Sequence, residues 1–343
     1  MRPAASDPRR LLSLIDRFAR VRIAVFGDLI ADEFIYGEIG RVSREAPVLI
    51  LNYDSTEIVP GGGGNAAANV AALGGRPVVA GLVGDDETGA RLLEALGGRA
   101  DVRRVVRSRA IRTPTKTRIL AGGVHSAKQQ VVRIDRAASR DGLPAEDRAR
   151  VERALLARAA GCDALLVSDY GSGLVTPAAA TAARRRLRVP RGRRAPLLMV
   201  DSRYALLRFR GLTLCTPNES EVEGLFGIRI GENRRVLEKA GRALLDRTRA
   251  ECVVITRGSR GMAVFERDRP TLHIPIFGSD EVTDVTGAGD TVIAAMTLAV
   301  AAGASFAEAA RLANYAGGIV VMKRGTATVG PDELRQAVLA DRG

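Results

Sequence analysis

Residues 284–291 read DVTGAGDT, and an apolar run, VIAAM, follows at 292–296. A glycine-rich turn that leads directly into an apolar run predicts a buried helix, which we expect over residues 288–302. The first N–H groups of a helix have no partner within the helix, and they lie at the positive end of its dipole. Residues 287–290 therefore predict an anion-binding site, suited to the charge on a phosphoryl group during transfer.

Asp290 falls in the first turn of this predicted helix, where its carboxylate can face the bound anion. There it can take a proton from an attacking hydroxyl group. The pattern alone allows a structural role equally well, with Asp290 stabilising the helix start and the glycines only forming the turn. The catalytic candidates are Asp290 as general base and the backbone amides of Gly287, Ala288 and Gly289.

A second glycine-rich stretch, PGGGGNAAANVAALG, occupies residues 60–74. Glycines let the backbone approach a ligand closely, and alanines let the following helix pack tightly. Asn65 is then placed to bond sugar hydroxyls. Gly61, Gly63 and Ala66 also match a dinucleotide-binding fingerprint, but the run follows Pro60 rather than a strand that opens a βαβ unit. A dehydrogenase is therefore disfavoured.

Several motifs of other enzyme classes are missing from the sequence. No Gly-Lys dipeptide occurs, which excludes a P-loop, and no Gly-x-Ser-x-Gly elbow occurs. The two histidines lack metal-ligand spacing. A phosphate-binding enzyme of this sequence needs another helix N-terminus, which again favours residues 287–290.

The composition constrains the partners and the compartment. The net charge is +13, but the arginines are scattered, aromatic residues make up 4% and tryptophan is absent. We therefore expect no nucleic-acid partner, while anionic small substrates remain compatible. Three widely separated cysteines, no signal-peptide pattern at the N-terminus and an apolar run too short to cross a bilayer predict a cytoplasmic protein without a membrane partner.

Short β-rich apolar runs alternate with helical stretches along the chain. We predict strands at 22–27, 77–83, 164–168, 197–201, 213–216 and 252–256, and helices at 64–74, 86–96, 145–160, 177–188, 232–248, 288–302 and 305–322. This alternation predicts one α/β domain over residues 1–343, with a doubly wound, mostly parallel sheet. Residues 33–60 and 109–135 instead alternate in the manner of antiparallel strands, and we expect a small β-sheet lid there.

The two glycine-rich stretches together resemble the signatures of the ribokinase-like (phosphofructokinase-B) sugar kinases, and the resemblance extends over nearly the whole chain. Within this family, several stretches are most similar to the kinases that phosphorylate D-glycero-D-manno-heptose 7-phosphate. The similar stretches are GDLIAD at 27–32, RVSREAPV at 41–48, SDYG at 168–171, TPN at 216–218 and DVTGAGDTVI at 284–293.

The resemblance implies ATP-dependent phosphorylation of a sugar, with Mg²⁺, and assigns roles to individual residues. Asp290 matches the catalytic base of the family. Sugar hydroxyls would be held by Asp32, Gly61, Gly62 and Asn65. The nucleotide and its Mg²⁺ would be bound by Asn218, Glu221, Thr256, Gly258, Gly261 and Asn314, with Glu221 reaching the metal indirectly. Asp284 and Thr286 match positions that help to bind a monovalent cation, such as K⁺, in some relatives.

Two further substrate-site candidates come from position in the sequence. Asp169, with Tyr170 beside it, follows a predicted strand at the end where ligands bind in open α/β sheets, although a plain turn is the alternative. Arg133, with Asp135, either reaches the substrate from the lid or forms an exposed cross-strand contact. An exposed edge of the lid sheet also predicts a homodimer.

The sequence departs from the heptose 7-phosphate kinases at residues 201–204. Those kinases read Asp-Pro-Lys-Gly, whereas this chain reads DSRY, so that Arg203 stands in place of the lysine. Arginine keeps the charge but changes the donor geometry. Another sugar or a nucleoside therefore remains an alternative acceptor, and a non-catalytic sugar- or nucleotide-binding protein is the alternative of a different class.

Overall fold

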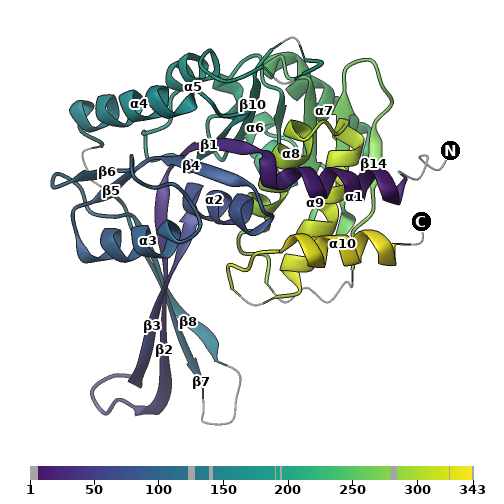
Figure 1. Cartoon of the computed structure of the whole chain (residues 1–343). Helices are drawn as coiled ribbons and strands as arrows, with labels where there is room; N and C mark the ends of the chain where they lie inside the picture. The colour runs from purple at the N-terminus through teal and green to yellow at the C-terminus, as the bar shows by residue number, and fades with distance from the viewer. Residues whose placement is uncertain are drawn as a thin grey trace.

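An eight-stranded sheet forms the centre of the described structure, in the order β14-β13-β12-β11-β10-β9-β1-β4 (Figure 1). The computed structural model describes residues 7–122, 128–138, 142–189, 191–193, 195–278, 284–323 and 325–341. The strands are β1 (Arg22–Gly27), β4 (Arg76–Ala80), β9 (Ala164–Asp169), β10 (Leu197–Ser202), β11 (Leu214–Cys215), β12 (Cys252–Thr256), β13 (Met262–Glu266) and β14 (Leu272–Ile274). From β4 to β12 neighbouring strands run parallel, whereas β13 and β14 are antiparallel.

Helices cover both faces of this sheet, which explains why its strands read as continuous apolar runs. In β1, Ile23 and Val25 face one core, and Ala24 and Phe26 face the other. The first core contains residues of α1 (Pro8–Arg17), α2 (Gly63–Ala72), α3 (Glu87–Gly97), α8 (Ala288–Ala301), α9 (Phe306–Val321) and α10 (Pro331–Ala340). The second contains residues of α4 (Ala145–Ala159), α5 (Pro177–Arg184), α6 (Glu219–Phe226) and α7 (Arg234–Thr248).

A separate four-stranded sheet, in the order β3-β2-β7-β8, extends away from the body (Figure 1). It is built from β2 (Leu29–Val42), β3 (Leu49–Gly62), β7 (Thr115–Gly122) and β8 (Gln129–Arg136). Because β2 begins two residues after β1 ends, and α2 follows β3 directly, the base of this small sheet lies at the carboxyl edge of the large one. A two-stranded sheet pairs β5 (Leu82–Gly84) with β6 (Val106–Ser108).

The α/β architecture with a mostly parallel sheet and a small second sheet is confirmed, and the structure corrects details. The strand predicted at 77–83 is two strands in different sheets, interrupted at Gly81, where a side chain would meet Leu29. Helices α1 and α10 and the antiparallel strands β13 and β14 were not predicted. In the described part of the chain, no helix combines the length and the apolar character needed to cross a bilayer.

Candidate active site

A cavity of about 400 Å³ lies where the carboxyl ends of the central strands meet the small sheet and the start of α8. Many of the residues proposed from the sequence line it: Asp32, Gly62, Asn65, Arg133, Asp169, Asn218, Glu221, Thr256, Thr286, Gly287, Gly289 and Asp290. Others do not: Gly61, Gly258, Gly261, Asp284, Ala288 and Asn314. Tyr170, considered from the sequence together with Asp169, also lines the cavity. Further lining residues were not singled out from the sequence, among them Lys116, Arg118, Asp201, Thr216 and Thr326.

The N-terminus of α8 presents backbone donors to this cavity. Gly287 is the N-cap residue, with φ 80°. A side chain here would meet the amide nitrogen of Asn65, so this position requires glycine on two counts. The N–H of Ala288 donates to Val285 O at 3.2 Å. Contrary to the prediction, the amide of Ala288 is therefore not free to bind an anion. Among the described residues, the N–H groups of Gly287, Gly289 and Asp290 have no acceptor, which leaves them available to an anion.

Asp290 is buried beside these amides, with only 3% of its surface exposed. Its Oδ2 accepts a hydrogen bond from Asn65 Nδ2 at 2.8 Å, and the Tyr170 hydroxyl lies 3.2 and 3.3 Å from its two carboxylate oxygens. Burial raises the pKa of Asp290 to about 7, against the opposing effect of these two donors. A carboxylate that titrates near neutral pH is well suited to accept a proton from a hydroxyl group.

A chain of side chains orients the amide of Asn65. Asn69 Nδ2 donates to Asn65 Oδ1 at 3.0 Å, and the Thr291 hydroxyl donates to Asn69 Oδ1 at 2.8 Å. The oxygen of the Asn65 amide is thereby occupied, and its nitrogen faces Asp290. The sequence predicted Asn65 against sugar hydroxyls but did not indicate its contact with the Asp290 carboxylate. The i, i+4 spacing of Asn65 and Asn69 places both amides on one face of α2, and this spacing was the sequence signal that the two side chains interact.

The side of the cavity next to the small sheet is rich in cations. Arg118 donates to Asp32 at 2.6 Å, and Arg133 donates to Asp135 at 2.7 and 2.6 Å. The Arg133–Asp135 pair lies along one strand, β8, and is not the cross-strand contact considered from the sequence. Lys116 lies next to Arg118 on the same face of β7, because side chains two residues apart share a face.

Lys116 and Arg203 are the cavity cations whose side chains have no hydrogen bond or ion pair within the described residues. Lys116 instead lies over the Tyr170 ring, with its Nζ 5.2 Å from the ring centroid. Burial lowers the pKa of Lys116, and the nearby arginines act in the same direction. The charge of Asp32 opposes the effect of burial, but no carboxylate of the described residues forms an ion pair with Lys116. A partly desolvated ammonium without a direct ion pair favours binding of an anion.

Asp169 and Asp201 provide the acidic floor of the cavity. Both oxygens of Asp169 are used by the protein, since Oδ1 accepts the Gly171 N–H at 3.0 Å and Oδ2 accepts the Ser202 hydroxyl at 2.7 Å. The pKa of Asp201 is raised well above its ordinary value by burial and then by the charge of Glu221.

Asn218 and Glu221 form a capping box at the start of α6. Asn218 Oδ1 accepts the Glu221 N–H at 2.9 Å, and Glu221 Oε2 accepts the Asn218 N–H at 2.9 Å. The Asn-x-x-Glu motif thus has a structural role here in addition to its place on the cavity wall. Burial raises the pKa of Glu221. The hydroxyls of Thr216 and Thr326 are buried without a partner in the described structure, so both can serve a bound ligand.

The remaining candidates lie outside the cavity. The Asp284 carboxylate accepts the N–H groups of Thr286 at 2.8 Å and Gly325 at 3.1 Å, which fixes the turn before α8. Asn314 on α9 donates to Pro275 O at 2.9 Å. Within the described residues, no group of three or more His, Cys, Asp or Glu side chains is arranged to hold a metal ion.

The fold and this site define a phosphotransferase, and comparison with known proteins names the family. Residues 22–333 match the model of the pfkB family carbohydrate kinases. The chain belongs to this family and is an ATP-dependent carbohydrate kinase.

Among curated proteins, the chain is similar to two bacterial proteins named bifunctional protein HldE. It is 40% identical to that of Pelobacter propionicus over 338 residues, covering 97% of this chain and 66% of the relative. It is 42% identical to that of Geobacter metallireducens over 329 residues, covering 96% and 65%. The chain thus spans just under two thirds of the length of these relatives.

Solved structures share the fold at low sequence identity. Phosphofructokinase-2 from Escherichia coli in complex with potassium matches with a TM-score of 0.71 and 20% identity, covering 93% of this chain and 98% of that chain. Ribokinase from Arabidopsis thaliana complexed with ribose and ATP matches with a TM-score of 0.64 and 20% identity, covering 93% and 97%.

Proposed function

We propose that this kinase transfers the γ-phosphate of ATP to a sugar phosphate, with D-glycero-D-manno-heptose 7-phosphate as the first candidate and the 1,7-bisphosphate as its product. The observation that carries the transfer chemistry is the buried Asp290 carboxylate, with its pKa near 7, beside the free amides at the start of α8. The unpaired Lys116 favours an anionic acceptor over a neutral sugar. The heptose itself is supported by the sequence resemblance and by the HldE relatives.

The proposed reaction uses these groups in one step. Asp290 takes the proton of the acceptor hydroxyl as that oxygen attacks the γ-phosphorus in line. The new P–O bond forms while the bond to the leaving ADP oxygen breaks. The N–H groups of Gly287, Gly289 and Asp290 stabilise the charge on the transferring group. Asp32, Gly61 and Gly62, with the second hydrogen of Asn65 Nδ2, hold the sugar, and Arg133 and Asp169 complete its pocket.

The nucleotide is proposed to lie along Asn218, Glu221 and Thr256, with Gly258, Gly261 and Asn314 on the adenine side. Mg²⁺ fits the carboxylates at this end of the cavity, because Asp201 and Glu221 are oxygen ligands whose mutual repulsion a cation would relieve. When bound, Mg²⁺ would neutralise charge on the phosphates. For K⁺, Asp284 and Thr286 remain the proposed residues.

The small sheet is proposed to act as the lid of a single domain and as a dimer interface. Its side chains Lys116, Arg118 and Arg133 already reach the cavity wall. On β8, the apolar Val132 and Ile134 are 46% and 42% exposed, and Tyr53 on β3 is 69% exposed. Exposed apolar side chains on a projecting sheet favour pairing with a second copy.

The deciding experiment is ADP release with a panel of acceptors: heptose 7-phosphate, fructose 6-phosphate, ribose, a nucleoside and the unphosphorylated heptose. We expect turnover with heptose 7-phosphate. Turnover with ribose or a nucleoside alone would refute the sugar-phosphate assignment. Saturable binding without ADP release for any acceptor would favour a non-catalytic binding protein.

A further inference from the structure

Tyr170 contacts the proposed base, although no role has been assigned to it so far. It is the first residue after β9, and its hydroxyl reaches both carboxylate oxygens of Asp290 at 3.2 and 3.3 Å. Asn65 binds the same carboxylate from α2. The base is therefore held between two donors that come from different elements of the fold.

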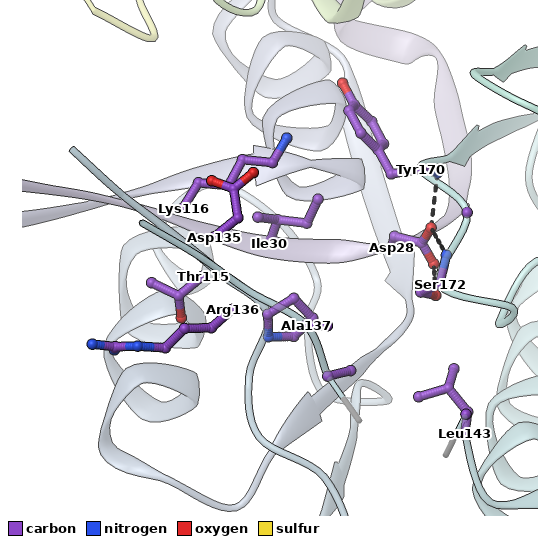
Figure 2. A pocket seen from close by; sticks show the side chains of 14 residues that line it. Asp28, Ile30, Thr115, Lys116, Asp135, Arg136, Ala137, Leu143, Tyr170 and Ser172 are labelled. Atoms are coloured by element: carbon purple, nitrogen blue, oxygen red, sulfur yellow. Dashed lines mark hydrogen bonds between the residues drawn. The ribbon is translucent and has the colours of Figure 1, made fainter. Parts of the chain in front are cut away.

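The backbone around Tyr170 is anchored by buried carboxylates. Asp28 Oδ2 accepts the N–H of Tyr170 at 2.8 Å and that of Ser172 at 3.3 Å, while Asp28 Oδ1 accepts the Ser172 hydroxyl at 2.5 Å. Figure 2 shows these bonds at one end of Tyr170 and the ring extending away from them. Gly171, at φ 86°, makes the turn, and its N–H is bound by Asp169. An anchored backbone limits where the ring can go.

The ring is also covered from the small sheet. Lys116 of β7 extends toward it (Figure 2), with its Nζ 5.2 Å from the ring centroid. Tyr170 and Lys116 line both the catalytic cavity and an adjoining one of about 350 Å³, so they form part of the wall between the two. The position of the Tyr170 ring is thus restricted by its own anchored loop on one side and by Lys116 of the small sheet on the other.

We propose that Tyr170 is a positioning residue for phosphoryl transfer, whose hydroxyl clamps the Asp290 carboxylate opposite Asn65 so that it faces the acceptor. This inference rests on the proposed role of Asp290 as base. Burial, and next the charge of Asp290, raise the pKa of Tyr170 well above 10, so its hydroxyl remains a proton donor at every working pH. A neutral donor of this kind stabilises the ionised carboxylate and opposes the effect of burial.

Other charged groups face Asp290 and act on the same equilibrium. Asp32 on β2 and Asp201 at the end of β10 disfavour its ionised form, whereas Lys116 on β7 favours it. These groups are unchanged when only the Tyr170 hydroxyl is removed. The substitution Tyr170→Phe therefore isolates the contribution of one hydrogen bond, with the ring and its contact to Lys116 kept.

The test is the pH dependence of ADP release by Tyr170→Phe between pH 6 and 9.5, at saturating ATP, with heptose 7-phosphate as acceptor. We expect the acidic limb of kcat to move to higher pH by about one unit, as for the loss of one bond to a charged group. With the pKa of Asp290 at about 7 in the wild type, kcat at pH 7 would fall about fivefold and return to within about twofold at pH 9. Tyr204→Phe, the same chemical change at an exposed neighbour, should leave the limb unmoved.

Two outcomes would overturn the proposal: an acidic limb at the wild-type pH, or a loss of activity that is equal at pH 7 and pH 9. Thermal melting of both variants shows whether each is folded. The variant Asp290→Asn separates this inference from the proposed function. If it retains turnover, the base assignment fails, whereas an unmoved limb in Tyr170→Phe with an inactive Asp290→Asn refutes the role of Tyr170 alone.

Discussion

Replacing Asp290 with asparagine is predicted to abolish most turnover and at the same time to stabilise the fold. Asparagine has nearly the same shape and can still accept the hydrogen bond from Asn65 through its Oδ1, so substrate binding should persist. It cannot take a proton from the acceptor. Because general-base assistance contributes about 10²–10⁴ in rate, kcat should fall by that factor while the KM for ATP changes little.

The gain in stability follows from the pKa of the buried carboxyl. Burial raises this pKa from 3.8 to about 7, and a shift of about three units corresponds to about 4 kcal/mol. In the unfolded chain the Asp290 carboxyl loses its proton near pH 4, whereas in the folded protein it keeps the proton until about pH 7. The wild type therefore loses stability as the pH rises through this window, and the neutral variant does not. The advantage of Asp290→Asn should grow from about 1.5 kcal/mol at pH 5 to about 4 kcal/mol at pH 8.

Denaturant unfolding of both proteins at pH 5, 6, 7 and 8 measures this difference, and ADP release measures turnover in the same preparations. A free-energy gap that does not change with pH would show that Asp290 is not a buried group with a raised pKa. Retention of more than about a tenth of wild-type kcat would show that it is not the base.

Three further substitutions test other parts of the site. Glu221→Gln keeps the capping geometry but removes a charge. We therefore expect about a tenfold rise in the KM for MgATP and an unchanged melting temperature. A large loss of stability would instead show that Glu221 is purely structural. At pH 9 Asp290 is ionised with or without the charge of Lys116. At this pH, Lys116→Met should lower kcat/KM about 10–100-fold for heptose 7-phosphate but little for the unphosphorylated heptose, with Lys128→Met as the control; equal losses for both sugars would contradict an anionic acceptor. Val132→Lys should convert a dimer to a monomer in light scattering at micromolar concentration, and a monomeric wild type would end the dimer proposal.

Much of the fold was predictable, because strands buried on both faces give continuous apolar runs. The helix starting at Ala288 and the glycine-rich turn before it followed from local sequence alone. The short antiparallel strands Met262–Glu266 and Leu272–Ile274 did not, since only a single 3-10 turn, Gly258–Arg260, separates the first of them from the parallel strand before it, in place of an α-helix. The N-terminal helix was missed although Leu11, Leu14 and Ile15 have helical spacing and are buried. This spacing, with Asp7 as N-cap before Pro8, was an available sequence signal for the helix.

The site was predictable in its residue types but not in its contacts. Asp290 and Asn65 are 225 residues apart, and Asp290 and Tyr170 are 120 apart. No local rule pairs such positions. The Asn-x-x-Glu motif shows a different difficulty, because one short spacing fits two interpretations: it is both a capping box and a motif of the family. Local physics alone does not distinguish the capping role observed at Asn218 and Glu221 from the nucleotide-binding role proposed for them.

The energetics of Asp290 also bear on the choice between an enzyme and a binding protein. An uncharged residue at this position would leave the fold more stable by up to about 4 kcal/mol at neutral to alkaline pH, and an amide could still bond a sugar hydroxyl. Binding alone therefore gives no physical advantage to a carboxylate buried between Asn65 and Tyr170. Proton transfer does, because it requires a group that is charged before the reaction and neutral after it. With its pKa near 7, the carboxylate is basic enough to take the proton of the acceptor hydroxyl, and its protonated form is acidic enough to release that proton again between turnovers.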